Sequence, residues 1–393
     1  MNSPTRRPFP AAPAFWRDIR FLQAAAQVLF LLLVLAAGGW LVGNLLETLD
    51  ARGMDLGFSF LRRTAGFAIS EGLPMERTDT FLRAFVVGLV NSLRVIGLGL
   101  ILTTLLGALA GVSLLSPNWL LRNIARVYVE VMRNTPLLVQ LFFIYFGIIL
   151  KLPSLEDRIV IGPLLLSQRG VFLPRPVPAG GSTLWTGVTV ACVALAALVY
   201  IRRLRRRTTT GEETRPGWWA AAIAIGVPTL LALAIPDGPF TWESPRLEGL
   251  RMVGGARLTP EFAGILFGLV LYTGAFIADV VRAGILAVPL GQLQAARSIG
   301  LSEFHVLRHV ILPQALRVIL PPLTNQYLNL AKNSSLAIGV GFPDVYNVTQ
   351  TIFNQSGQAV QMIALVMTTY LAISLLISAT MNFLNQRLRI VER

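Results

Sequence analysis

The segment VPLGQLQAARSIGLSEFHVLRHVILPQA, residues 288–315, joins two strongly apolar runs of the chain. It is only moderately apolar, and a proline lies near each of its ends. Pro289 favours the start of a helix and Gly300 favours its end, so the pattern predicts a short helix over residues 291–299.

A second helix is predicted directly after that glycine. Ser302 is a good N-cap, Glu303 lies in the first turn, and the helix would run toward Pro313. The small pair Ala295 and Ala296 would allow another protein surface to approach the first helix closely. Residues 288–315 therefore predict two short helices joined by a turn, suited to insertion into a groove on a partner.

The runs on either side of this segment are long enough to cross a bilayer, and they are not alone. Eight segments approach the ~20 apolar residues that a membrane-spanning helix needs. The predicted spans are residues 24–42, 87–113, 134–150, 184–201, 217–235, 262–278, 316–337 and 360–383. Pro321, Pro322 and Lys332 interrupt the seventh of these segments, where a break in the helix is expected.

The composition agrees with a membrane protein. Hydrophobic residues make up 54% of the 393 positions and charged residues only 14%, whereas soluble domains carry about 25% charge. The net charge of +14 suggests nucleic-acid binding, but the basic residues cluster in short segments between the apolar runs. We therefore expect an all-α, polytopic membrane protein with about eight transmembrane helices and no nucleic-acid partner.

The arginines also predict the orientation of the chain. They are concentrated in residues 1–20, 116–133 and 202–216 and in the C-terminal tail, whereas the alternate loops are longer and hold most of the acids. Short loops rich in Lys and Arg stay on the cytoplasmic side. Both termini are therefore expected in the cytoplasm, and the first span is expected to be an uncleaved anchor rather than a signal peptide.

Several kinds of chemistry find no support in the sequence. A phosphate-binding loop needs a Gly-Lys pair, but Lys151 and Lys332, the only lysines, follow Leu and Ala. Cys192 is the single cysteine, which excludes an internal disulfide, and the pair His305 and His309 reads as helix surface. We expect no enzyme activity, no cofactor and no metal site in this chain.

The pattern Gln294-Ala295-Ala296-x-x-x-Gly300, followed after nine residues by Val310-Ile311-Leu312-Pro313, resembles the EAA loop of binding-protein-dependent ABC permeases. That loop reads E-A-A-x-x-x-G, nine residues, I-x-L-P. Gln294 replaces the glutamate and Val310 the isoleucine. The lost charge leaves open whether a salt link to the ATPase is weakened.

Other strings resemble the polar-amino-acid permeases within that family. They are VEVMRNTPLLVQLFFIYFG (129–147), LYTGAFIADVVRAGI (271–285) and NQYLNLAKNSSLAIGVGFPD (325–344). The eight spans, the long insertion after the third and the ending MNFLNQRLRIVER are most similar to the first permease subunit of general L-amino-acid importers. The resemblance is strong over residues 84–150 and 260–393 and rests on layout elsewhere.

The resemblance implies a type I ABC importer permease with cytoplasmic coupling helices in the bacterial inner membrane. Its implied partners are a second, homologous permease subunit, a cytoplasmic ABC ATPase dimer that binds ATP and Mg, and a periplasmic amino-acid-binding protein that delivers an L-amino acid. The residues implied to couple to the ATPase are Gln294, Ala295, Ala296, Gly300 and Pro313.

The implied organisation has three parts. Residues 1–20 form a cytoplasmic N-terminal tail, and residues 21–83 form the first span with its outer loop. Residues 84–393 form the permease domain, which an insertion at 151–260 interrupts with two extra spans.

The polar stretch in the seventh span is the candidate substrate pathway, because a zwitterionic amino acid needs donors for its carboxylate and acceptors for its ammonium. The candidates are Asn325, Gln326, Asn329, Lys332, Asn333, Ser334 and Ser335. The alternative is that these groups bond between helices, with Lys332 and the two serines holding structure near an inner gate. Arg94 either meets acidic side chains or extends to the outer interface.

Three rival functions stay open at this point. A permease restricted to one class, such as glutamate and aspartate or the basic amino acids, would share this architecture. An ion-coupled secondary carrier would work alone, although its predicted spans hold almost no acids to bind and release ions. A membrane scaffold or receptor would not need the 288–315 segment.

Overall fold

The computed structural model describes residues 19–51, 57–178, 182–210, 216–234, 240–249 and 251–388. Most of the predicted tail 1–20, part of the loop 202–216 and the last residues of the chain lie outside these ranges. The α-helices are α1 Ile19–Ala51, α2 Phe81–Ser113, α3 Trp119–Asn134, α4 Leu137–Phe142, α5 Ser182–Thr210, α6 Pro216–Ala221, α7 Val227–Ala234, α8 Pro260–Leu286, α9 Leu290–Ser298, α10 Glu303–Val306, α11 Leu312–Asn333, α12 Val345–Ser356 and α13 Ala359–Leu388.

Short 3₁₀ and π turns extend or join several of these helices. They are η2 Ser59–Arg62, η3 Phe143–Ile148, η4 Ile149–Lys151, η5 Ala222–Gly226, η6 Leu307–Ile311 and η7 Ser334–Val340.

The part of the chain that the structure describes also contains eight short strands, which the sequence did not predict and which form a small cap. They are β1 Ile159–Ile161, β2 Leu164–Ser167, β3 Gly170–Leu173, β4 Arg175–Pro178, β5 Phe240–Glu243, β6 Arg246–Glu248, β7 Arg251–Val253 and β8 Ala256–Leu258. All pairs are antiparallel, in a four-stranded sheet β1-β2-β3-β8 and two two-stranded sheets, β4-β5 and β6-β7. The two flanks of the predicted insertion therefore pair with each other, through β3 with β8 and β4 with β5.

Six helices in the described part of the chain are long and apolar enough to cross a membrane. They are Phe21–Thr48, Phe81–Ser113, Trp185–Arg206, Pro260–Leu286, Glu303–Val340 and Ala359–Arg387. These six coincide with six of the eight predicted spans. Helical, membrane-spanning architecture is thus confirmed, and the two remaining spans fall on shorter helices.

The predicted third span, 134–150, starts later than expected. Trp119–Asn134 and Leu137–Lys151 form a pair bent by 110° at the intervening break. Pro136 causes the break because it supplies no N–H and disfavours helical backbone in the preceding Thr135. The segment before it is therefore a separate helix, α3, that runs across the direction of the span.

The predicted fifth and seventh spans also differ from expectation. Residues 217–235 yield a shorter apolar helix, Gly217–Leu231, in which a π turn separates α6 from α7. In contrast, α11 is continuous through Pro321 and Pro322, so the expected break at these prolines is wrong. Packed neighbours in membrane proteins tolerate prolines inside helices, because local adjustments satisfy the freed backbone groups.

The central contact of the molecule is between α2 and α8, and glycines make it close. A Cβ added at Gly107 would lie 2.5 Å from Ile277, and one at Gly111 would lie 2.7 Å from the Ala278 carbonyl oxygen. Small residues at such crossings let two helix backbones approach. Helices α2 and α8 also share a hydrophobic core with α11 and α13. Its buried side chains include Ile96, Ile277, Ala315, Ile319, Leu330, Ile373 and Ile377.

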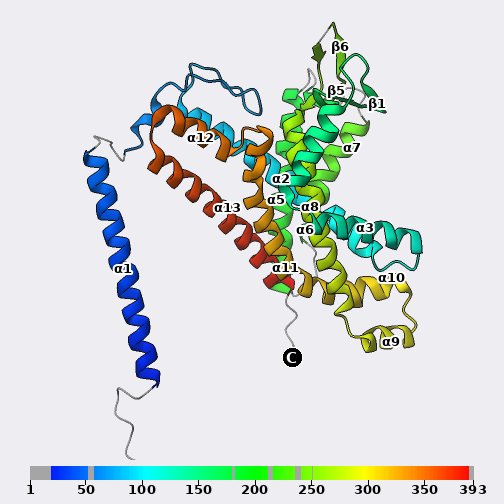
Figure 1. Ribbon diagram of the computed structural model, residues 1–393. Coiled ribbons are helices and arrows are strands. Elements are labelled where there is room, and N and C mark those ends of the chain that lie inside the picture. The colour runs from blue at the N-terminus through cyan, green and yellow to red at the C-terminus, as the bar shows by residue number, and fades with distance from the viewer. Residues whose placement is uncertain are drawn as a thin grey trace, which may run out of the picture.

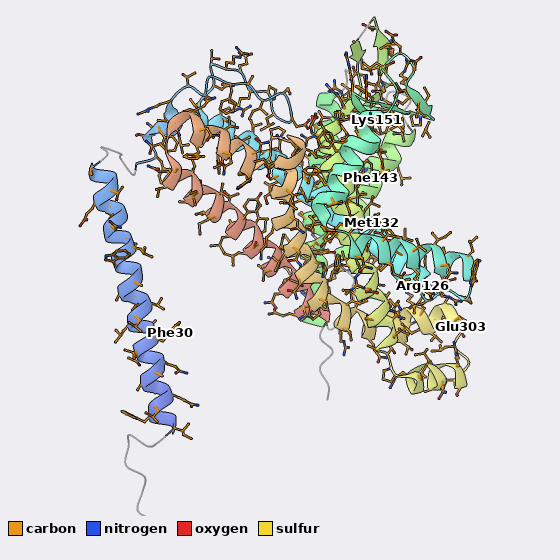
Figure 2. All side chains as sticks on the ribbon, in the orientation of Figure 1. Phe30, Arg126, Met132, Phe143, Lys151 and Glu303 are labelled. Atoms are coloured by element: carbon orange, nitrogen blue, oxygen red, sulfur yellow. The ribbon has the colours of Figure 1, made fainter. Side chains whose placement is uncertain are left out.

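The molecule has two distinct ends (Figure 1). The strands, α12 and the segment 57–80 lie at one end, here called the strand end, and α9 with α10 projects from the other, here called the loop end. Helix α1 lies apart from the bundle, and side chains such as Phe30, 70% exposed, project into open space (Figure 2). An apolar helix with no buried surface is stable only against lipid or another chain.

Candidate functional site

The loop end contains the predicted first helix and the predicted turn, but the second helix does not end near Pro313: α10 continues through η6 into α11, within the single helical segment Glu303–Val340. Pro289 is the N-cap of α9, and Gly300 adopts φ +81° just after that helix ends. The Gly300 amide donates to the Arg297 carbonyl at 3.0 Å and the Leu301 amide to the Ala296 carbonyl at 3.3 Å. These two bonds form a Schellman motif, for which glycine at the left-handed position is strongly preferred.

An ion pair holds the second helix against the first. Ser302 is the N-cap of α10, and its hydroxyl lies 2.7 Å from Nδ1 of His305. Across the turn, Arg297 Nε and Nη2 donate to the two carboxylate oxygens of Glu303 at 2.9 and 3.1 Å. Such a bidentate pair fixes geometry more than it adds stability on an exposed surface. The angle between α9 and α10 is therefore set by both backbone and side chains.

The predicted coupling residues divide by exposure. Gln294, Ala295 and Gly300 are exposed, Ala296 is buried at 6% exposure, and Pro313 is half-buried in the first turn of α11. Around them the loop end exposes large apolar side chains: Leu290 at 74%, Ile299 at 77% and Phe304 at 63%. A polar and apolar surface of this kind, with small residues between larger ones, suits a protein partner.

The loop end is rigidly joined to two long helices. Val288, directly before α9, is buried in the same core as Ala315 and Ile319 of α11. A Cβ added at Gly284 of α8 would lie 2.3 Å from Ile319, so α8 and α11 approach closely just above the loop. A force on α9 and α10 is therefore transmitted to both helices, because packed cores do not deform continuously.

The candidate pathway residues do not form one cluster. Asn325, Asn329 and Lys332 recur at helical spacing on an exposed face of α11, whereas Gln326 and Asn333 are half-buried. The Ser334 and Ser335 hydroxyls donate to backbone carbonyls three residues earlier, both at 2.8 Å.

One of these residues lines a cavity. Asn325 lies at a space of about 250 Å³ between α11 and α13, together with Ser378, Asn382 and Asn385. The polar bond that joins α11 to α2 is made instead by Tyr327, whose hydroxyl lies 2.6 Å from that of Thr104.

Ion pairs connect two of the long helices to segments distant in the sequence. Arg94 of α2 donates to Glu71, in the segment 57–80, at 3.1 Å. Asp279 pairs with Arg282 at 3.9 Å, and it also accepts from Arg133 of α3. Hydrophobic spacing predicts neither the Arg94 nor the Arg133 contact, because each joins residues on different elements.

Comparison with known proteins places these features in context. Residues 250–390 match the family described as binding-protein-dependent transport system inner membrane component. This stretch contains α8 to α11, and hence the whole loop end.

Longer similarity extends over nearly the entire chain. A putative amino-acid ABC transporter permease protein of Escherichia coli is 43% identical, over 93% of this chain and 94% of the relative. A general L-amino acid transport system permease of Rhizobium johnstonii is 38% identical, over 96% and 94%. A glutamate/glutamine/aspartate/asparagine transport system permease of Rhodobacter capsulatus is also 38% identical, over 96% of each chain.

Proposed function

The chain belongs to the binding-protein-dependent transport system inner membrane components, and from this premise we propose that it is the permease subunit of an ATP-driven importer that carries a general range of L-amino acids, polar ones included. Three relatives named as amino-acid transport permeases match 93–96% of this chain. The chain is a transport subunit of the inner membrane.

The observation that carries the mechanism is the construction of the loop end. It exposes Ala295 and apolar side chains, fixes their geometry through Gly300 and the Arg297–Glu303 pair, and continues into α8 and α11. We propose that an ATPase grips α9 and α10, with Gln294, Ala295, Ala296, Gly300 and Pro313 as the coupling residues. Closure of the ATPase on ATP would then rock α8 and α11 between two states.

The proposed assembly contains four kinds of component. They are this chain, a second homologous permease subunit, an ABC ATPase dimer that binds ATP and Mg, and a periplasmic amino-acid-binding protein. In the proposed orientation both termini and the loop end lie in the cytoplasm, and the strand end faces the binding protein. Residues 84–393 form the proposed permease domain, and the insertion 151–260 contributes the strand cap.

The proposed pathway runs along the polar face of α11. Asn325, Asn329 and Lys332 are exposed there, which suits an aqueous path between this chain and a second permease. Gln326 and Asn333 border this face. Ser334 and Ser335 bond to their own backbone, which supports a structural role.

A narrower substrate range is the second candidate. The Rhodobacter relative is named for glutamate, glutamine, aspartate and asparagine, and it is as similar as the general L-amino-acid permease. Competition of L-glutamine uptake by unlabelled L-glutamate, L-arginine and L-leucine separates the two. A broad permease is inhibited by all three, whereas a restricted one is inhibited by L-glutamate alone.

The energy source tests the proposal as a whole. We expect the chain alone in liposomes to move no L-glutamine under a proton or sodium gradient, because its described spans hold few acids that could bind and release an ion. With the second permease, the ATPase and the loaded binding protein, uptake should occur and require ATP hydrolysis.

Omission of the binding protein and replacement of ATP by a non-hydrolysable analogue are the controls, and each should abolish uptake. Gradient-driven uptake by the isolated chain would instead support a secondary carrier and overturn the proposal.

A further inference from the structure

A large polar cavity lies at the strand end, opposite the loop end. Its volume is about 750 Å³, within the range of small-molecule sites. Four separate parts of the chain line it: residues 67–71, Tyr145, the approach to α8 and residues 340–351. Because these segments are far apart in sequence, the cavity is a product of the tertiary fold.

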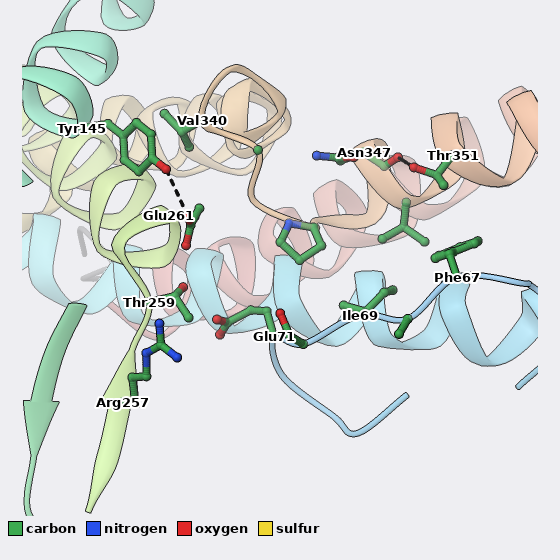
Figure 3. Close-up of a pocket in the computed structure, with 15 residues that line it drawn as sticks. Phe67, Ile69, Glu71, Tyr145, Arg257, Thr259, Glu261, Val340, Asn347 and Thr351 are labelled. Carbon is green, nitrogen blue, oxygen red and sulfur yellow. Dashed lines mark hydrogen bonds between the residues drawn. The ribbon is translucent and has the colours of Figure 1, made fainter. Parts of the chain in front are cut away.

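One wall carries a carboxylate held by a neighbouring helix. Glu261 lies in the first turn of α8, where Thr259 is the N-cap and Pro260 the first residue. The Tyr145 hydroxyl donates to Glu261 Oε1 at 3.0 Å, and both side chains line the cavity (Figure 3).

A second carboxylate, Glu71, and a cation, Arg257, also line this cavity. Glu71 is buried, and one of its oxygens accepts from Arg94 at 3.1 Å. Arg257, from β8, donates through Nε and Nη2 to the Arg169 carbonyl at 3.1 and 2.9 Å, which fixes the guanidinium and leaves its other N–H groups free to bind. Figure 3 shows Arg257, Glu71 and Glu261 around the same space.

We propose that this strand-end cavity receives the amino acid released by the binding protein, before the permease opens inward. Arg257 binds the α-carboxylate, and Glu71 with Glu261 binds the α-ammonium. This inference rests on the proposed function, and it adds a substrate site that is separate from the polar face of α11.

The mixture of charges identifies the ligand. A cavity for an anion alone would not hold two carboxylates, and a cavity for a cation alone would not hold a fixed guanidinium. A zwitterionic amino acid pairs with both the carboxylates and the guanidinium. Its side chain would then lie against the other polar residues of the cavity, which include Asn347 and Thr351. Because every α-amino acid presents the same two groups, such a site suits a permease of broad range.

The test measures L-glutamine moved per ATP hydrolysed in the reconstituted complex. L-glutamine has an uncharged side chain, so the measurement reports on the α-groups. We expect Glu261→Gln and Arg257→Gln each to lower this ratio about tenfold, because a charge-assisted hydrogen bond is lost and the amino acid escapes outward before the cavity closes. ATP hydrolysis stimulated by the loaded binding protein should stay at the wild-type rate.

Glu248→Gln and Arg246→Gln are the matched controls, since both residues lie in β6 of the strand cap and neither lines the cavity. They should leave both quantities unchanged. Unaltered transport in the two cavity variants would overturn the inference while the importer assignment stands. A parallel loss of stimulated ATP hydrolysis would also overturn it, because the cavity would then dock the binding protein. Failure of the wild-type complex to transport would instead count against the proposed function itself.

Discussion

At the scale of single residues, Asp344 is the most unusual ionisable group outside the spans. It lies beyond the end of the Glu303–Val340 span and is only 1% exposed. It caps α12 by accepting from the Asn347 amide at 2.8 Å, and it also accepts from the Tyr370 hydroxyl. Burial raises the pKa of this carboxyl from 3.8 to about 7, and the Asn347 hydrogen bond opposes the rise only in part.

This shift makes stability depend on pH. Because the pKa of Asp344 is higher in the folded chain, its contribution to stability is complete below pH 3.8 and is lost as pH rises to about 7. Each pH unit within this window corresponds to about 1.4 kcal/mol. Asp344→Asn keeps the cap without the charge.

We expect Asp344→Asn to raise the melting temperature over the wild type more at pH 8 than at pH 5. Melting in detergent at both pH values checks this, and the comparison with wild type cancels other titrating groups. If the variant and the wild type differed in melting temperature by the same amount at pH 5 and pH 8, the buried Asp344 carboxyl would not be the cause of the pH dependence.

Residue-level prediction from sequence succeeds where the cause is local. Gly300, Ser302 and Pro289 occupy the turn, cap and helix-start positions expected of them, because each acts on backbone within a few residues. The Arg94–Glu71 pair and the Arg257 contact depend on segments that only the fold brings together. No spacing along the chain encodes them.

At the scale of elements, the turn between α9 and α10 is the most informative. Gly300 has φ +81°, yet a Cβ added there would meet no atom within 4 Å. A substitution at this position therefore strains the backbone without a clash, by about 1–2 kcal/mol. That is enough to shift the orientation of α10 relative to α9 while both helices remain folded.

We expect Gly300→Ala to lower ATP hydrolysis stimulated by the loaded binding protein about fivefold or more, with normal insertion in the membrane. Gly291→Ala is the matched control, because Gly291 lies in α9 with no neighbour near its Cβ position and no positive φ. If stimulated ATP hydrolysis fell by the same factor in both variants, or stayed at the wild-type rate in both, the turn would have no role in coupling.

Prediction of elements succeeds for long apolar runs and fails at prolines. Pro136 separates α3 from α4, whereas Pro321 and Pro322 leave α11 continuous. The difference is one of packing. Leu320 and Leu323, which flank Pro321 and Pro322, are buried in the core that α11 shares with α8 and α13. Local helix propensity alone cannot predict which prolines break a helix, because tertiary contacts decide whether the carbonyl that loses its hydrogen bond is tolerated.

At the scale of the whole molecule, the two ends have different chemistry and different predicted partners. The loop end exposes small and apolar side chains on a rigid turn, and the strand end encloses a charged cavity. Sequence predicted the loop end almost completely, since one contiguous segment forms it. It could not predict the cavity, whose walls come from four parts of the chain that lie far apart in the sequence.

The central claim is that α9 and α10 contact the ATPase, and site-directed photo-cross-linking tests it most directly. In a Cys192→Ala background, a benzophenone maleimide is attached at Ala295→Cys on the loop end or at Glu248→Cys on the strand end, both exposed positions. In the assembled complex, we expect the probe at residue 295 to cross-link to the ATPase and the probe at residue 248 not to do so. Cross-linking of the ATPase from residue 248, with none from residue 295, would contradict this expectation.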